Sequence, residues 1–315
     1  MKKPITFLRH YIDGRIITYR AQHGRGSYYD NLKQFNHQPV LSPAEVSDLI
    51  RAKLAGGEPF MVCRFGANEL ATLKTFDFGL KGKYAHQLSR MHTFAGLFPE
   101  TDETGFRFAD LMKEEIPQAD LIGIWPQAFE AYYTKAYGKD TLNYTLLPSL
   151  NPWAVKEHPW SAGLKGKKVL VVHPFEESIR TQYQKKNQLF PGTEILPDFS
   201  LDVMKSVQTS GGNEDERFGS WFEAYEWMKE EILKRDFDTA ILGCGAYGFP
   251  LAAEIRKAGK QAIHLGGTTQ LLFGIYGSRW DNNPLIQNLR NDAWVRPLES
   301  EKPKNASSVE NACYW

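Results

Sequence analysis

An arginine and a glutamate stand close together where a short apolar run ends. Arg64 follows Phe60–Cys63, and Gly66 and Glu69 come directly after it. Arg64 needs an anion, which could be a phosphate group of a ligand or Glu69 alone. Glu69 could bind a metal, orient an acceptor hydroxyl or act as a general base. Alternatively, it is a surface glutamate that complements a helix dipole. We predict that Arg64 and Gly66 bind a ligand and that Glu69 is catalytic.

Two histidines end other apolar runs. His173 closes the run Lys168–His173, and His264 occupies the equivalent place in Gln261–Leu265. His173 could donate a hydrogen bond to a phosphate or accept a proton, and Arg180 follows as a further cation. Either histidine could also be a satisfied structural residue. We predict that His173 is catalytic and that Arg180 and His264 bind the ligand.

Glycines follow the last two apolar runs. Gly266 and Gly267 leave the backbone after His264 open to a ligand, and Gly243–Gly248 has the pattern G-x-G-x-x-G. In that pattern the first glycine permits a tight turn and the second lets a phosphate approach helix N–H groups. A dinucleotide site would also need an acidic residue at the end of the next strand, where none stands. The alternative is a turn that serves only helix–strand packing. We predict ligand binding by these residues: Gly243, Gly245, Tyr247, Gly248, Gly266 and Gly267.

Several common types of site are excluded. The sequence has no recognisable Ser-His-Asp or Cys-His set, no P-loop and no ordinary zinc pattern. Three cysteines are too few for a disulfide framework, and 38 basic residues against 37 acidic ones do not call for a nucleic-acid partner.

The elements that must position these side chains alternate between strand and helix. Continuous apolar runs lead through Gly- or Pro-containing turns into helical patterns, which predicts strands buried on both faces of a mainly parallel sheet. We therefore expect a doubly wound, Rossmann-like α/β fold whose ligands bind at the carboxyl ends of the strands. The five predicted strands are Phe60–Phe65, Leu121–Trp125, Lys168–His173, Thr239–Leu242 and Gln261–Leu265.

We divide the chain into three parts. Residues 1–40 read as an irregular N-terminal arm, residues 41–290 as the α/β domain and residues 291–315 as a tail. Ser42 and Glu45 predict a capped helix that runs to about Leu54. Within the tail, residues 299–308 suggest a loose linker, whereas the terminal Cys-Tyr-Trp is apolar enough to dock on the domain. Neither a signal-peptide core nor an 18-residue apolar run is present, so we expect a cytoplasmic protein.

Several of these segments together resemble a family. Arg64-Phe65-Gly66-x-x-Glu69-Leu70 is similar to the Arg-Phe-Gly-Asp-Gly-Glu-Leu segment of the bacterial glycosyltransferases of GT-D fold. The stretches 237–245, 251–253 and 260–266 resemble the second signature of that family, at a matching spacing, so the resemblance spans about residues 45–275. The whole chain also resembles proteins of capsule and surface-polysaccharide gene sets, through residues 274–281 and the terminal Cys-Tyr-Trp.

The resemblance implies a glycosyltransferase that moves a sugar from a nucleotide-sugar donor to a glycan or lipid-linked acceptor. It also implies peripheral association with membrane assembly machinery. The predicted binding residues would then hold the donor nucleotide. In the family an Asp-x-Glu pair holds a divalent metal, Mn or Mg, on the donor diphosphate, but here Ala67 replaces the aspartate and Glu69 remains. Cations such as Arg64, His173 and Arg180 could neutralise the diphosphate instead, or Glu69 could bind a metal with Asp77 or Asp281.

Two other classes of protein stay open. A non-catalytic member could bind nucleotide or glycan and act as a scaffold of polysaccharide assembly, which the loss of the aspartate at position 67 would suit. The G-x-G-x-x-G pattern could instead serve an adenosyl-cofactor enzyme, either a methyltransferase or an NAD-dependent oxidoreductase.

Overall fold

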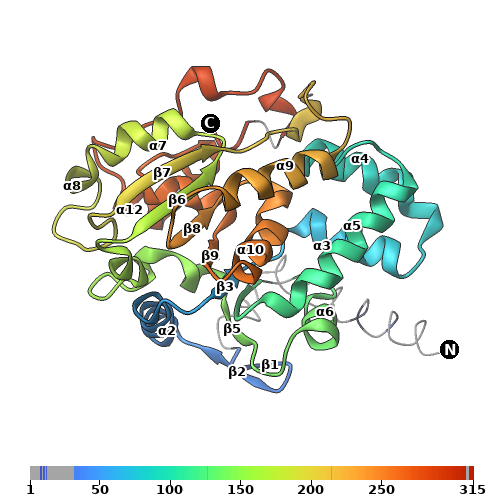
Figure 1. Cartoon of the computed structure of the whole chain (residues 1–315), viewed down its shortest axis with the longest axis horizontal. Helices are drawn as coiled ribbons and strands as arrows, with labels where there is room; N and C mark the ends of the chain where they lie inside the picture. The colour runs from blue at the N-terminus through green and yellow to red at the C-terminus, as the bar shows by residue number, and fades with distance from the viewer. Residues whose placement is uncertain are drawn as a thin grey trace.

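The computed structural model describes residues 8, 10, 12, 32–125, 127–213, 215–309 and 312–315. Within them a single nine-stranded sheet has the strand order β1-β2-β5-β4-β3-β9-β8-β6-β7 (Figure 1). The strands are β1 (Gln34–Phe35), β2 (Gln38–Leu41), β3 (Phe60–Cys63), β4 (Leu121–Ile124), β5 (Asn143–Leu146), β6 (Lys168–His173), β7 (Ser200–Lys205), β8 (Thr239–Leu242) and β9 (Gln261–His264).

All neighbouring strands from β2 to β7 in this order are parallel, and only the short β1 pairs antiparallel, with β2. The carboxyl ends of the parallel strands therefore share one edge. The central β3 lies between β4 and β9. Strands β4 and β5 follow β3 on one side, and the later strands β6 to β9 lie on its other side, so the strand order reverses at β3. Such a reversal leaves a crevice at the carboxyl edge. The predicted parallel α/β fold is confirmed.

Side chains of each strand alternate between two apolar cores. In β3, Met61 and Cys63 face one core, whereas Phe60 and Val62 face the other. Helices α3 (Ala67–Asp77), α4 (Tyr84–Ala95), α5 (Asp102–Glu115), α9 (Trp221–Leu233) and α10 (Gly248–Lys257) cover the first core. The second core is covered mainly by α2 (Pro43–Gly56), α7 (Glu176–Tyr183), α8 (Lys186–Leu189), α11 (Thr269–Leu272) and α12 (Pro284–Leu289), and α6 (Glu130–Tyr137) packs beside the first.

Helix α2 begins as predicted. The Ser42 hydroxyl accepts the Glu45 N–H, and the Glu45 carboxylate accepts the Ser42 N–H at 2.8 Å, which completes a capping box. The helix ends at Gly57, whose left-handed conformation (φ 70°) suits glycine.

Four strands were not predicted. Strand β1 and most of β2 fall within residues 1–40, so the expectation of an irregular arm is wrong there, and most of the remaining arm lies outside the described residues. Strand β7 escaped prediction because it is an edge strand with Asp202 and Lys205 in its sequence, and β5 because it is short and half polar. The boundaries of the three parts remain a prediction.

The segment after residue 298 is not a loose linker. Glu301 is buried, and its carboxylate accepts the backbone N–H of Glu177 at 2.7 Å and the hydroxyl of Ser178. These groups lie in the first turn of α7, so Glu301 caps that helix from a distant part of the chain. The end of the chain lies near α7 (Figure 1), and the predicted docking of the terminal Cys-Tyr-Trp is confirmed. Within the described residues, no helix is both long and apolar enough to cross a membrane.

Candidate functional site

A cavity of about 580 Å³ opens at the carboxyl edge of the sheet. Residues that follow each of the strands from β3 to β9 line it, together with the end of α4 and residues from later in the chain. It brings together ten of the twelve predicted site residues: Arg64, Gly66, Glu69, His173, Gly243, Gly245, Tyr247, His264, Gly266 and Gly267.

The two other predicted residues lie outside the lining. Arg180 forms ion pairs with Glu176 at 3.0 Å and Asp202 at 3.3 Å and donates to the Val203 carbonyl at 2.7 Å. These contacts tie α7 to β7, so Arg180 has a structural role that accounts for its charge. Gly248 is absent from the lining and packs against the His264 ring.

Arg64 is a cationic group of the cavity lining that directly follows β3. Its guanidinium lies 5.3 Å from the ring centroid of Trp125, which also lines the cavity. The Trp125 indole donates to the Phe65 carbonyl at 2.9 Å, which fixes this aromatic support. Arg64 makes no hydrogen bond or ion pair with any described residue, Glu69 included. Its five N–H donors are thus available for a ligand anion.

Glu69 occupies the third position of α3, and its carboxyl group folds back over Gly66, the N-cap residue. A side chain at Gly66 would overlap that carboxyl and displace it from its present position. Burial raises the pKa of Glu69, although the nearby positive charge of Arg64 opposes the shift. A carboxylate with a raised pKa at the side of a cavity is suited to proton transfer.

A second glutamate near Arg64 was not predicted. Glu130 is buried, and one carboxyl oxygen accepts the Trp125 N–H at 3.2 Å while the other has no partner in the described chain. Burial raises its pKa well above the usual range. Trp125, whose N–H binds Glu130, could have been predicted as a site residue from the sequence, because it follows β4 as Arg64 follows β3.

His173 is a buried neutral imidazole. Its Nδ1 accepts the Phe175 N–H at 3.1 Å, so the ring proton lies on Nε2. Burial lowers its pKa to about 3. A histidine that is neutral at physiological pH and protonated on Nε2 can donate a hydrogen bond, but it is not poised to accept a proton.

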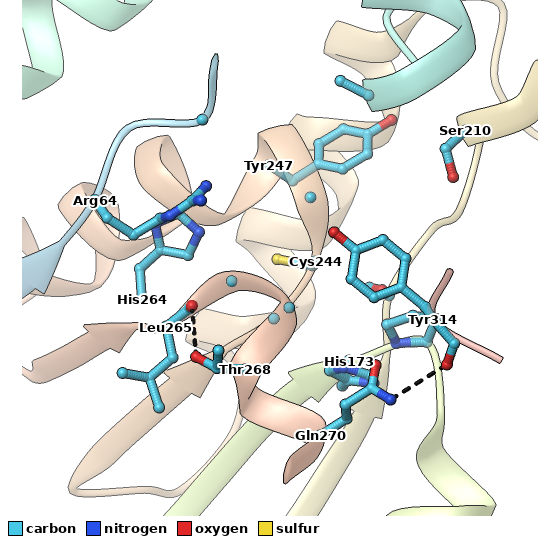
Figure 2. Close-up of a pocket in the computed structure, with 18 of the residues that line it drawn as sticks. Arg64, His173, Ser210, Cys244, Tyr247, His264, Leu265, Thr268, Gln270 and Tyr314 are labelled. Atoms are coloured by element: carbon cyan, nitrogen blue, oxygen red, sulfur yellow. Dashed lines mark hydrogen bonds between the residues drawn. The ribbon is translucent and has the colours of Figure 1, made fainter. Parts of the chain in front are cut away.

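His264 is also buried and neutral. Burial, aided by the positive charge of Arg64, lowers its pKa to about 3. Figure 2 shows its ring beside the Arg64 side chain. Its Nδ1 is buried and has no hydrogen-bond partner among the described residues.

These two histidines explain the outer glycines of the G-x-G-x-x-G pattern. A Cβ at Gly243 would lie 2.6 Å from the His173 ring, and one at Gly248 would lie 2.5 Å from the His264 ring. Gly245 has open space around it, but its φ of 59° favours glycine. The pattern therefore serves packing at its first and last positions and leaves its middle position open to the cavity.

Tyr247 lies within this turn and is fixed on both sides. Its ring stacks on Trp221 at 4.5 Å, and its hydroxyl lies 3.4 Å from the Thr209 hydroxyl. Burial raises its pKa above the usual range, so the phenol stays protonated.

The model of the GT-D fold-like domain family matches residues 41–272. The chain belongs to this family. One solved structure, described as "The highly conserved domain of unknown function 1792 has a distinct glycosyltransferase fold", aligns over 83% of this chain and 92% of its own, with 13% sequence identity and a TM-score of 0.43. A search of curated proteins gave no match.

The cavity of this GT-D-like chain has a lining that does not fit the divalent metal expected from the resemblance. Within the described chain Glu69 is its one acidic lining residue. Asp77 pairs with Lys113 at 3.3 Å and Asp281 pairs with Arg296 at 2.7 Å, and both aspartates lie outside the lining. The described residues contain no cluster of three or more potential metal-ligating side chains of the His, Cys, Asp or Glu type.

The GT-D-like segment does not supply the whole cavity. Five lining residues follow position 272, where the family match ends. We call them the Tyr314 wall: Arg279, Trp280, Val309, Tyr314 and Trp315.

Proposed function

We propose that this GT-D-like chain is a glycosyltransferase. It would move a sugar from a nucleotide-sugar donor to a glycan or lipid-linked acceptor, in the cytoplasm, as a step of bacterial surface-polysaccharide synthesis. The observation that carries the proposal is Arg64, a cation held over Trp125 inside a cavity at the carboxyl edge of the sheet, whose donors bond to no residue that the structure describes. Peripheral association with membrane assembly machinery belongs to the same proposal.

The cavity can stabilise a departing nucleoside diphosphate without a metal. When the bond between the sugar and the diphosphate breaks, negative charge develops on the phosphate oxygen. Groups that are already oriented toward that charge lower the barrier most. Arg64 supplies a positive charge, the Nε2–H of His173 supplies a neutral donor, and the open backbone of Gly245 and Gly266 allows close approach of a phosphate.

Glu69 is the proposed general base. As the acceptor hydroxyl oxygen bonds to the sugar carbon, its proton passes to the Glu69 carboxylate, and the diphosphate leaves with the electron pair of the broken bond. Burial raises the pKa of Glu69, which makes it a stronger base than an exposed glutamate, and the nearby positive charge of Arg64 partly opposes that shift.

The test is release of nucleoside diphosphate from a panel of nucleotide sugars, measured for wild type, Glu69→Gln and Glu223→Gln. Glu223 is a matched control. It is the third residue of α9, after the N-cap Ser220, as Glu69 is the third residue of α3, but it does not line the cavity. We expect Glu69→Gln to lose about 10²-fold or more of turnover while donor binding persists, and Glu223→Gln to keep full turnover. Full turnover by Glu69→Gln would remove Glu69 from catalysis.

A second candidate function rests on Ala67. Because the aspartate of the family's pair is absent, the chain could bind a nucleotide or glycan and act as a scaffold. Donor binding without turnover, with every nucleotide sugar and acceptor offered, would favour the scaffold. Stabilisation only by NAD or an adenosyl methyl donor would favour the adenosyl-cofactor enzyme and overturn both proposals.

A further inference from the structure

The Tyr314 wall lies outside the segment that defines the family. The residues that match the GT-D fold-like domain end at position 272, and they contribute Arg64, Glu69, both histidines and the glycine turns. A part of the cavity that lies outside the segment matching the family model is a candidate for substrate specificity rather than for the shared chemistry.

Residues 312–315 are held in place by several contacts. The backbone N–H of Arg279 donates to the Cys313 carbonyl at 2.9 Å, and that of Ser278 donates to the Trp315 carbonyl at 2.8 Å. The buried side chain of Gln270 donates to the Tyr314 carbonyl at 3.2 Å, as Figure 2 shows. The segment is therefore an ordered part of the cavity.

The Tyr314 ring is positioned by its neighbours. The Arg279 guanidinium donates to its hydroxyl at 3.0 Å and lies 4.8 Å from its ring centroid. A Cβ at Gly267 would come within 2.5 Å of the ring, and one at Gly277 would overlap the Tyr314 backbone. Both glycines thus leave room for Tyr314, which lines the cavity.

Tyr314 and Arg64 both line the cavity and lie on different sides of one turn. Figure 2 shows Arg64 and His264 on one side of the Leu265–Thr268 turn and Tyr314 on the other. In a nucleotide sugar the diphosphate joins a nucleoside to the sugar. With the diphosphate at Arg64 and the reacting sugar carbon at Glu69, the nucleoside must extend away from both residues, because it is joined to the other side of the diphosphate.

We propose that Tyr314 is a specificity-determining residue that packs against the base of the donor nucleoside. The inference rests on the proposed function, since it assumes a nucleotide-sugar donor with its diphosphate at Arg64. A flat aromatic ring is the side chain suited to a flat base, and stacking of the two is favourable in water.

The test is calorimetric titration with the uridine, guanosine, cytidine and adenosine diphosphates and with inorganic pyrophosphate, which lacks a base. The variants are Tyr314→Ala, Tyr314→Phe and Arg64→Ala. Tyr276→Ala is a matched control, because Tyr276 also lies against arginines, at 4.4 Å from Arg290 and 4.3 Å from Arg296, but does not line the cavity.

We expect Tyr314→Ala to weaken the best-binding nucleoside diphosphate about 10-fold or more and to reduce the preference among the four bases. Pyrophosphate binding should stay unchanged. Tyr314→Phe and Tyr276→Ala should bind like wild type, whereas Arg64→Ala should weaken both kinds of ligand.

Three results would overturn the inference while the proposed function stands. In the first, Tyr314→Ala weakens the binding of pyrophosphate and of the nucleoside diphosphate equally. In the second, it weakens the binding of neither. In the third, it weakens the binding of the intact nucleotide sugar alone, which would place the sugar at Tyr314. If the wild-type protein binds neither pyrophosphate nor any nucleoside diphosphate, the proposed function itself fails and the inference fails with it.

Discussion

At the scale of single residues, burial decides what the cavity's titratable groups can do. His173 and His264 are 2% and 3% exposed, and burial lowers the pKa of each to about 3. Their types and positions were predicted from the sequence, but the protonation state was not. It depends on packing against Gly243 and Gly248 and, for His264, on the charge of Arg64.

The histidine pair predicts a loss of stability in mild acid. An unfolded histidine binds a proton below a pH of about 6.5, whereas these folded histidines bind one only near pH 3. Their contribution to stability is therefore complete above pH 6.5 and falls as the pH drops toward 3. At pH 5 the loss is about 2 kcal/mol per histidine.

Urea unfolding at pH 7.5 and pH 5 measures this loss. A double variant, His173→Gln with His264→Gln, serves as the reference because it lacks both titrating groups. The free energy of unfolding of the wild type should fall more steeply between the two pH values than that of the variant. Equal falls would mean that the two histidines are not held neutral by the fold.

At the scale of elements, the conformation of the turn after β8 depends on side chains of neighbouring strands. The sequence predicted the G-x-G-x-x-G turn between β8 and α10 but not which glycine serves packing and which faces the cavity. That distinction comes from side chains on β6 and β9, which are distant in the sequence. The capping of α7 by Glu301 has the same long-range character.

Gly248→Ala tests the packing of α10 on β9. An alanine in a helix is normally more stable than glycine by up to about 1 kcal/mol. Here the added methyl group would meet the buried His264 ring, so we expect a net loss of about 1–3 kcal/mol. Gly56→Ala is the control, since Gly56 is also helical and has open space around its Cα.

Thermal or urea unfolding of the two variants separates the effects. Gly56→Ala should match or exceed the stability of the wild type, while Gly248→Ala should fall below it. A Gly248→Ala protein as stable as Gly56→Ala would show that His264 moves easily and does not fix the turn.

At the scale of the whole molecule, the parallel sheet gathers distant residues at one edge. Arg64, His173 and His264 are far apart in the sequence, yet each stands at the end of an apolar run, and that position alone predicted their meeting. The same rule could not place Arg180, because its partner Asp202 becomes a neighbour only when α7 packs on β7, whereas Glu176 lies one turn before it on the same helix. Nor could it show how residues after position 272 fold back over the cavity.

The central claim is that this cavity binds a nucleoside diphosphate through Arg64 without a metal. The most direct measurement is titration of the wild type, Arg64→Ala and Arg180→Ala with four nucleoside diphosphates, NAD and an adenosyl methyl donor, each with EDTA or with manganese. Arg180→Ala is the control for losing an arginine, because Arg180 is paired outside the cavity lining.

We predict that one nucleoside diphosphate binds the wild type equally well in EDTA and in manganese. Arg64→Ala should bind it about 10- to 100-fold more weakly, the loss of a charge-assisted contact, and Arg180→Ala should bind it normally. Unchanged binding by Arg64→Ala, binding that appears only with manganese, or binding of the adenosyl cofactors alone would contradict the account.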